Sequence, residues 1–140
     1  MKPPTPPRAE APARVLAMIV AANGLVDDCE LRALDELDAF ARLDISRERF
    51  VELAAACAAE VGTHLCECSW LCAEDLRYLD ALLDAVPDPE QRALVCRLGA
   101  VVMKADGRET LDERLVYDHA LARWHISEAS ASLQPLSRAP

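Results

Sequence analysis

The pattern of hydrophobic and polar positions predicts a chain made of helices. Apolar residues recur three and four positions apart, as they do along one face of a helix. The range 94–105 shows this most clearly, with Leu98, Val101 and Val102 at i, i+3 and i+4. The same spacing predicts helices over 13–22, 27–43, 46–62, 73–85, 89–105 and 111–124, with a further short helix from Ser127. We therefore expect an all-α, compact bundle of six to seven helices.

Residues at the ends of these ranges favour the same boundaries. Pro87 stops the helix over 73–85, because the residue before a proline avoids the helical region. Asp88 followed by a proline is a typical helix start. Thr110 and Glu113 have the spacing of a capping box, and Gly107 suits the left-handed residue that closes a helix.

The helix–turn–helix unit over 94–117 has a counterpart near the start of the chain. A shift of 83 positions pairs Arg14 with Arg97, Ala17 with Ala100, Ala22 with Ala105, Asn23 with Asp106, Gly24 with Gly107, Glu30 with Glu113 and Asp35 with Asp118. Further along, His125-Ile-Ser127 repeats Asp44-Ile-Ser46. The sequence thus predicts an internal pseudo-twofold duplication.

Length and composition indicate one domain with two tails. The 140 residues are 52% hydrophobic but only 4% aromatic, and they include five prolines before position 13. We expect a flexible Pro-rich arm over 1–12, a helical domain over 13–127 and a frayed tail over 128–140. Neither a membrane-spanning run of about 18 apolar residues nor a signal peptide is evident, so we expect a cytoplasmic protein.

The net charge of −9 makes nucleic acid an unsuitable partner, because an acidic surface repels phosphates. It favours cations or basic proteins instead. No Gly-rich phosphate loop, nucleophile elbow or HExxH motif is present, so the sequence gives no reason to expect an enzyme.

The acidic turn after residue 105 is the first candidate site. Asp106 follows a helix carboxyl end, where the helix dipole disfavours a negative charge. A hard cation such as calcium, magnesium or manganese, shared with Glu109, Asp112 or Glu113, is one way to compensate. Hydrogen bonds from the following loop, with Glu113 closing its capping box, are the other. The first copy has an uncharged Asn23 at the equivalent position.

A cysteine cluster is the second candidate site. His64, Cys66, Cys68 and Cys72 place four soft ligands within nine residues. The spacing differs from that of a usual zinc module, which separates two ligand pairs by a longer loop. The thiols can bind a soft metal or react with an oxyanion, or the segment can be a semi-buried connector. His119 and His125 flank Trp124 and are interpreted as residues at the edge of the core.

The twin turns, Ala22-Asn23-Gly24 with Glu30 and Ala105-Asp106-Gly107 with Glu113, resemble those of the TerB-like family of tellurite-resistance proteins. The likeness covers about 13–127. It implies a bundle of about seven helices with pseudo-twofold symmetry, stress-response roles and at most peripheral membrane association. It also implies divalent-cation binding by the acidic residues that match the family pattern, which are Asp106, Glu109, Asp112 and Glu113 in the second turn and Asp27, Asp28 and Glu30 in the first. The Cys-rich connector and Asn23 depart from that pattern.

These observations give a leading hypothesis and two alternatives. The first is a non-enzymatic stress-response domain that acts as a protein-interaction scaffold and binds a divalent cation. The second is a thiol module built on Cys66, Cys68 and Cys72. The third is a pure interaction bundle or homodimer with neither chemistry.

Overall fold

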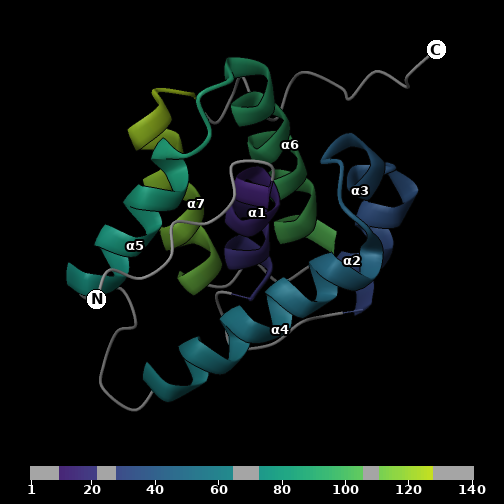
Figure 1. Ribbon diagram of the computed structural model, residues 1–140, viewed down its shortest axis with the longest axis horizontal. Coiled ribbons are helices and arrows are strands. Elements are labelled where there is room, and N and C mark those ends of the chain that lie inside the picture. The colour runs from purple at the N-terminus through teal and green to yellow at the C-terminus, as the bar shows by residue number, and fades with distance from the viewer. Residues whose placement is uncertain (1–9, 22–27, 65–72, 106–110, 128–140) are drawn as a thin grey trace.

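The computed structural model describes residues 10–21, 28–64, 73–105 and 111–127; within these, the side chains of 58–64, 73–76, 78 and 111–113 are not described. The described part of the chain folds into seven helices without a strand (Figure 1). The helices are α1 (Ala11–Ala21), α2 (Asp28–Glu36), α3 (Ala39–Arg42), α4 (Arg47–His64), α5 (Ala73–Asp84), α6 (Pro89–Ala105) and α7 (Leu111–Trp124). The predicted all-α bundle is confirmed.

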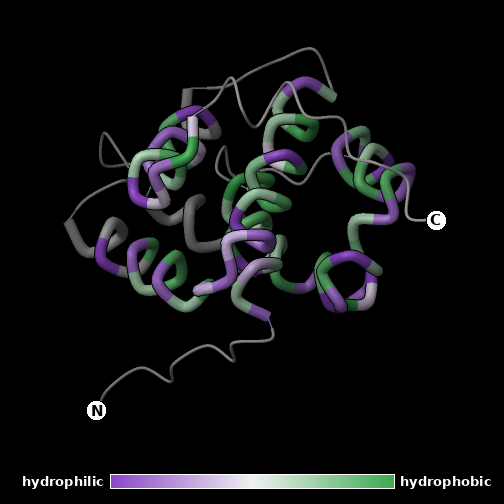
Figure 2. Tube along the Cα trace, turned by 90° about the horizontal axis from the view of Figure 1, so that it is seen from above, coloured by the Kyte–Doolittle hydropathy of each residue, from purple (hydrophilic) through white to green (hydrophobic). Residues whose placement is uncertain are grey.

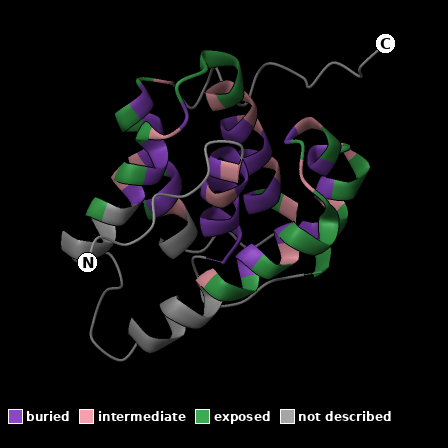
Figure 3. Cartoon of the chain, in the orientation of Figure 1, coloured by how far each residue is buried: buried purple, intermediate pink, exposed green. Residues whose placement is uncertain are grey.

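Helix α1 is the centre of the bundle, and α4, α5, α6 and α7 all pack against it (Figure 1). Ten of its eleven residues are buried, so hardly any of its surface reaches solvent (Figure 3). Its composition explains this position, because small alanines let neighbouring helices approach while Leu16 and Ile19 fill the space between them. The first helix is therefore surrounded by helices that follow it in the chain.

The surrounding helices turn their apolar sides towards α1. Figure 2 shows hydrophobic positions concentrated inside the bundle and hydrophilic positions on its outer surface. The buried residues include Phe50 of α4, Leu83 of α5 and Tyr117 of α7. Among the described segments, no helix combines the length and apolar character needed to cross a membrane.

The helix predicted over 27–43 is not continuous, which corrects the sequence interpretation. It breaks between α2 and α3, where Asp38 adopts a left-handed conformation with φ of 54°. Aspartate tolerates this conformation better than most residues. The Nε of Arg42 donates to the carbonyl oxygen of Leu37 at 2.9 Å, so this carbonyl, which has left the helix, is satisfied. Apolar periodicity alone did not reveal the break.

Other helix bounds agree with the sequence to within a few residues. Helices α6 and α7 match the predicted ranges. Helix α1 begins at Ala11, two residues earlier than expected, because Pro12 is tolerated in a first turn. Helix α4 is capped by the hydroxyl of Ser46, which accepts from the amide of Arg49 at 3.1 Å. It continues past Gly62 to His64, so this glycine does not end it.

The helix bounds support the internal duplication. Moving α1 and α2 by 83 positions places the end of α1 within one residue of the end of α6, and the first residue of α2 on the first residue of α7. The turns that contain Gly24 and Gly107 lie outside the described residues. The shift falls to 81 at the left-handed residues that follow α3 and α7, Asp44 and His125, so the first copy has two extra residues, and the break at Asp38 accommodates them.

Both copies end in the same closing turn. Asp44 and His125 are left-handed, each with φ of 56°. Ile45 donates its amide to Phe40 and Ile126 to Leu121, each at 3.0 Å from nitrogen to oxygen. This is the pattern of a Schellman motif, in which the second residue beyond the helix reaches back to its last turn. The repeated Asp-Ile-Ser and His-Ile-Ser sequences thus mark equivalent structural positions.

Replacing His125 with glycine should stabilise the fold. A left-handed residue other than glycine is disfavoured by about 1 kcal/mol, and glycine removes that strain. We expect His125→Gly to raise the free energy of unfolding by up to about 1 kcal/mol in urea denaturation. His125→Ala is the control, since it keeps the strain. A glycine variant less stable than the unmodified chain would mean that the imidazole contributes more than the strain costs, and a glycine variant no more stable than the alanine variant would contradict the prediction.

Candidate functional site

The described acidic residues of the first turn do not converge on one point. Asp28 and Glu30 both lie in the first turn of α2, where Asp28 is exposed and Glu30 is 1% exposed. Residues two apart on a helix face different directions. Glutamate is seldom this buried. Glu30 lies at the amino end of α2, where the helix dipole favours negative charge, and this position suits a structural role in the turn.

The rest of the predicted cation site is only partly described. Asp112 and Glu113 lie in the first turn of α7, without described side chains, and Glu113 is the equivalent of the buried Glu30. Asp27, Asp106 and Glu109 lie outside the described residues. Within the part that the structure describes, no three His, Cys, Asp or Glu side chains gather as metal ligands would. The cation site stays a prediction.

The cysteines outside the cluster differ in their suitability for thiol chemistry. Cys66, Cys68 and Cys72 lie outside the described residues, and His64 is the last residue of α4, without a described side chain. Cys29 is exposed and Cys57 is half-buried. Cys96 is buried in α6, and burial raises the pKa of its thiol to about 12. A thiolate is the reactive form, so Cys96 is inert at neutral pH.

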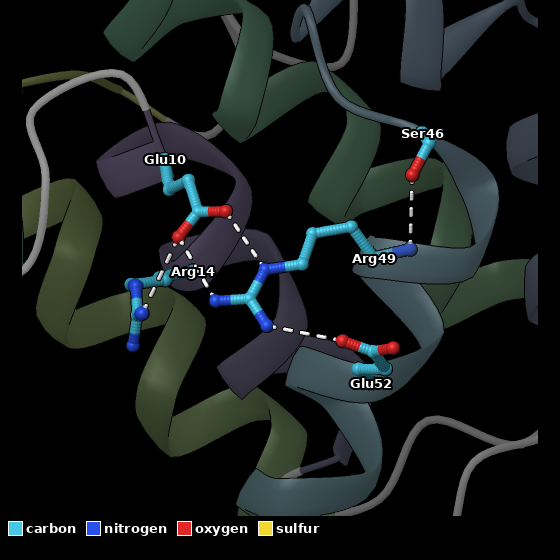
Figure 4. A network of polar contacts seen from close by, with 5 residues as sticks. All are labelled: Glu10, Arg14, Ser46, Arg49 and Glu52. Carbon is cyan, nitrogen blue, oxygen red and sulfur yellow. Dashed lines mark hydrogen bonds and ion pairs between the residues drawn. The ribbon is translucent and has the colours of Figure 1, made fainter.

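A polar network joins the start of α1 to the first turn of α4 (Figure 4). The carboxylate of Glu10 accepts two hydrogen bonds from Arg49, at 2.8 and 3.2 Å, and a third from Arg14 at 3.4 Å. Arg49 also donates to Glu52 at 3.0 Å. The two-point contact between Glu10 and Arg49 fixes the orientation of both groups. It links the start of α1 to the first turn of α4.

The network predicts a stability difference that depends on pH. The hydrogen bonds from Arg49 lower the pKa of Glu10 below its ordinary 4.5. A lowered pKa means that this stabilisation is complete above pH 4.5 and is lost as pH falls through the lowered value. We expect Arg49→Met to lower the urea midpoint at pH 7 and to have a smaller effect at pH 3. Arg47→Met, which removes the exposed pair with Asp35, is the control. An equal loss at both pH values would contradict the prediction.

A second set of ion pairs joins α5 to α7. Arg123 donates to both oxygens of Asp84, at 2.9 and 2.8 Å, and its hydrogen bonds lower the pKa of that carboxyl. His119 Nε2 lies 2.7 Å from Asp80, and both side chains are about one-third exposed. These contacts hold α5 and α7 together at the surface. The partial exposure of His119 agrees with its interpretation as a residue at the edge of the core.

A surface depression of about 580 Å³ lies where α6 begins and α7 ends. Its lining consists of Pro89, Arg92, Ala93, Trp124, His125, Ile126 and Ser127. The Nε of Arg92 donates to the carbonyl oxygen of Val86 at 2.6 Å, and its guanidinium lies 5.7 Å from the centre of the Trp124 ring. The indole nitrogen donates to Leu83 at 3.0 Å. The cation is therefore held in place at the edge of the depression.

Sequence reasoning did not find this depression or the network around Glu10. Their parts lie far apart in the chain, and only the packing of α1, α4, α6 and α7 brings them together. The repeated Asp-Ile-Ser and His-Ile-Ser motifs were the sequence feature that pointed to them. Ser46 of the first motif lies beside the Glu10 network, and Ser127 of the second lines the depression. Comparison with protein-family models, curated proteins and solved structures yields no match to this chain.

Proposed function

We propose that this protein is a TerB-like, non-enzymatic stress-response domain that acts in the cytoplasm as a scaffold for other proteins. The agreement of the helix bounds in the two halves, together with their identical closing turns, is the observation that supports the proposal. Duplicated helix pairs joined at acidic turns are the feature on which the family resemblance depends. The acidic charge favours basic partners or cations over nucleic acid.

The proposal includes a divalent cation at the second acidic turn, held by Asp106, Glu109, Asp112 and Glu113. Carboxylate oxygens suit calcium, magnesium or manganese. The first turn, with Asp27, Asp28 and Glu30, is the weaker candidate because Asn23 lacks the charge of Asp106 and Glu30 is buried. In this proposal the first turn has a structural role and the second turn binds the cation.

Calorimetric titration of the full chain with each cation tests this part. We expect one ion to bind and its affinity to fall at least tenfold in Asp106→Asn, Glu113→Gln. The control is Asp118→Asn, an exposed acid on the same helix. Titration curves without binding heat for all three ions, or unchanged affinity in the double variant, would remove the cation from the proposal. Survival of a host strain on tellurite, with and without the chain, tests the stress-response role separately.

The alternative function is a thiol module built on Cys66, Cys68 and Cys72, with His64 as a further soft ligand. Cys96 is buried and inert, so its thiol would not compete with those of the cluster. Thiol counting on native and unfolded protein, with metal analysis, tests it. Fast-reacting thiols that disappear in Cys66→Ser, Cys68→Ser, Cys72→Ser would support this function over the cation scaffold.

A further inference from the structure

The two halves of the protein differ in how their equivalent first helices are covered. Helix α4 follows the closing turn of the first half and makes an extensive contact with α1. On α1, Ala11 and Met18 are buried, with 0% and 6% exposure. Their equivalents at a shift of 83 are Leu94 and Val101 on α6, and both are only partly buried. The face of α6 that corresponds to a covered face of α1 is thus partly open.

The depression at the start of this face matches a filled position in the first half. There, Glu10 of the α1 start bonds Arg49 in the first turn of α4, three residues after Ser46 (Figure 4). The equivalents of Glu10 and Ser46 are Ala93 and Ser127, and both line the depression. The first turn of a helix occupies this position in one half, while an open space is present in the other.

We propose that the depression and the adjoining face of α6 bind an amphipathic helix supplied by another protein, with an acidic residue in its first turn. This inference rests on the scaffold role proposed above and gives it a surface. In the first half, the acid is Glu10 at the start of α1 and the cation is Arg49 on α4. In the second half the acid is replaced by Ala93, and Arg92 is held at the edge of the same space. The first turn of a bound helix would therefore carry an acid where α4 carries the cation Arg49.

Charge along α6 agrees with an acidic partner. In a chain of net charge −9, α6 carries Arg92, Arg97 and Lys104 against one acid, Glu90, so this helix is positively charged. Partly buried Leu94 and Val101 lie between them and suit an apolar stripe on the partner. A helix with apolar residues at i, i+3, i+4 and i+7 presents such a stripe, as peptides bound in helical grooves do.

The chain's own sequence after Ser127 does not have the pattern of α4. At a shift of 81, the positions of Phe50, Leu53 and Ala54 correspond to Ala131, Gln134 and Pro135. Large apolar residues are thus missing where α4 buries them. Proline in a helix interior also removes a hydrogen bond and clashes with the preceding turn. Sequence favours a separate polypeptide over this segment as the occupant.

The test is a selection of 20-residue peptides that keep the apolar spacing of α4 and vary all other positions, against the full-length chain. We expect binders with Asp or Glu in the first turn. Their affinity, measured by fluorescence anisotropy, should fall at least tenfold in Arg92→Glu. Ala93→Trp, which fills the depression and keeps the Arg92 side chain, should weaken binding as much. Arg32→Glu, an exposed charge on α2, is the control and should change little.

Other outcomes would overturn the inference. A selection without binders, or binders insensitive to both Arg92→Glu and Ala93→Trp, would show that this surface is not a docking site. In the second case the scaffold role survives and only its location fails. Binding that occurs only in Leu133→Ser, Leu136→Ser would assign the site to the chain's own C-terminal residues. A dimer in sedimentation that Val101→Glu dissociates would assign it to a second copy.

Discussion

Leu16→Ala should lower the free energy of unfolding by about 2 to 5 kcal/mol. Leu16 is fully buried near the middle of α1, the helix that four others contact. Truncation removes buried apolar surface and leaves a cavity that the surrounding helices cannot close without losing their own contacts. Urea denaturation followed by circular dichroism at 222 nm, the standard probe of helix content, measures the loss.

The matched control is Leu115→Ala, the same substitution on α7 at a side chain that is 39% exposed. We expect it to change stability by about 0.5 kcal/mol or less, because solvent already reaches this leucine. Comparable losses in the two variants would mean that α1 is not the centre of the core. The ratio of the two effects, and not either value alone, tests the arrangement of helices around α1.

Gly99→Val should destabilise the protein by about 1 to 3 kcal/mol. Gly99 lies in the middle of α6, and a Cβ placed there would lie 3.1 Å from Cδ1 of Ile19 and 3.2 Å from Cδ1 of Tyr117. Both neighbours are fully buried, so neither has free space to move into. Valine adds a Cβ and two methyl groups where α6 contacts Ile19 of α1 and Tyr117 of α7. Thermal unfolding with denaturant titration measures the effect.

Two further variants separate packing from helix propensity. Gly99→Ala gains up to about 1 kcal/mol in propensity against its tight contacts, so we expect a small net change. Ala122→Val, on the exposed side of α7, measures the penalty of a branched residue without crowding. If Gly99→Val behaved like Ala122→Val, the close approach of the three helices would be disproved.

Local features of the fold were readable from the sequence. The apolar period located six ranges, and proline and capping residues set the bounds of α6 and α7, because both signals act within a few neighbouring residues. The break at Asp38 was not readable, because Leu34, Leu37 and Ala41 keep the helical spacing across it. Nor did the pattern show which helix is central.

The candidate sites divide in the same way. Acidic turns and clustered cysteines are visible in sequence because their members are neighbours in the chain, and most of these residues lie outside the part that the structure describes. The Glu10–Arg49 network and the depression beside Arg92 depend on residues about 40 positions apart. Their existence required the helices to be placed in space.

By itself, the sequence determined that this chain is helical, acidic and duplicated, because helix formation, charge and repetition are properties of short segments. Only the tertiary structure decided that α1 is enclosed and that the equivalent α6 keeps one partly open face. Which face of a helix is covered depends on contacts between distant segments, and the periodicity of one helix is the same whether its apolar face meets its own chain or another.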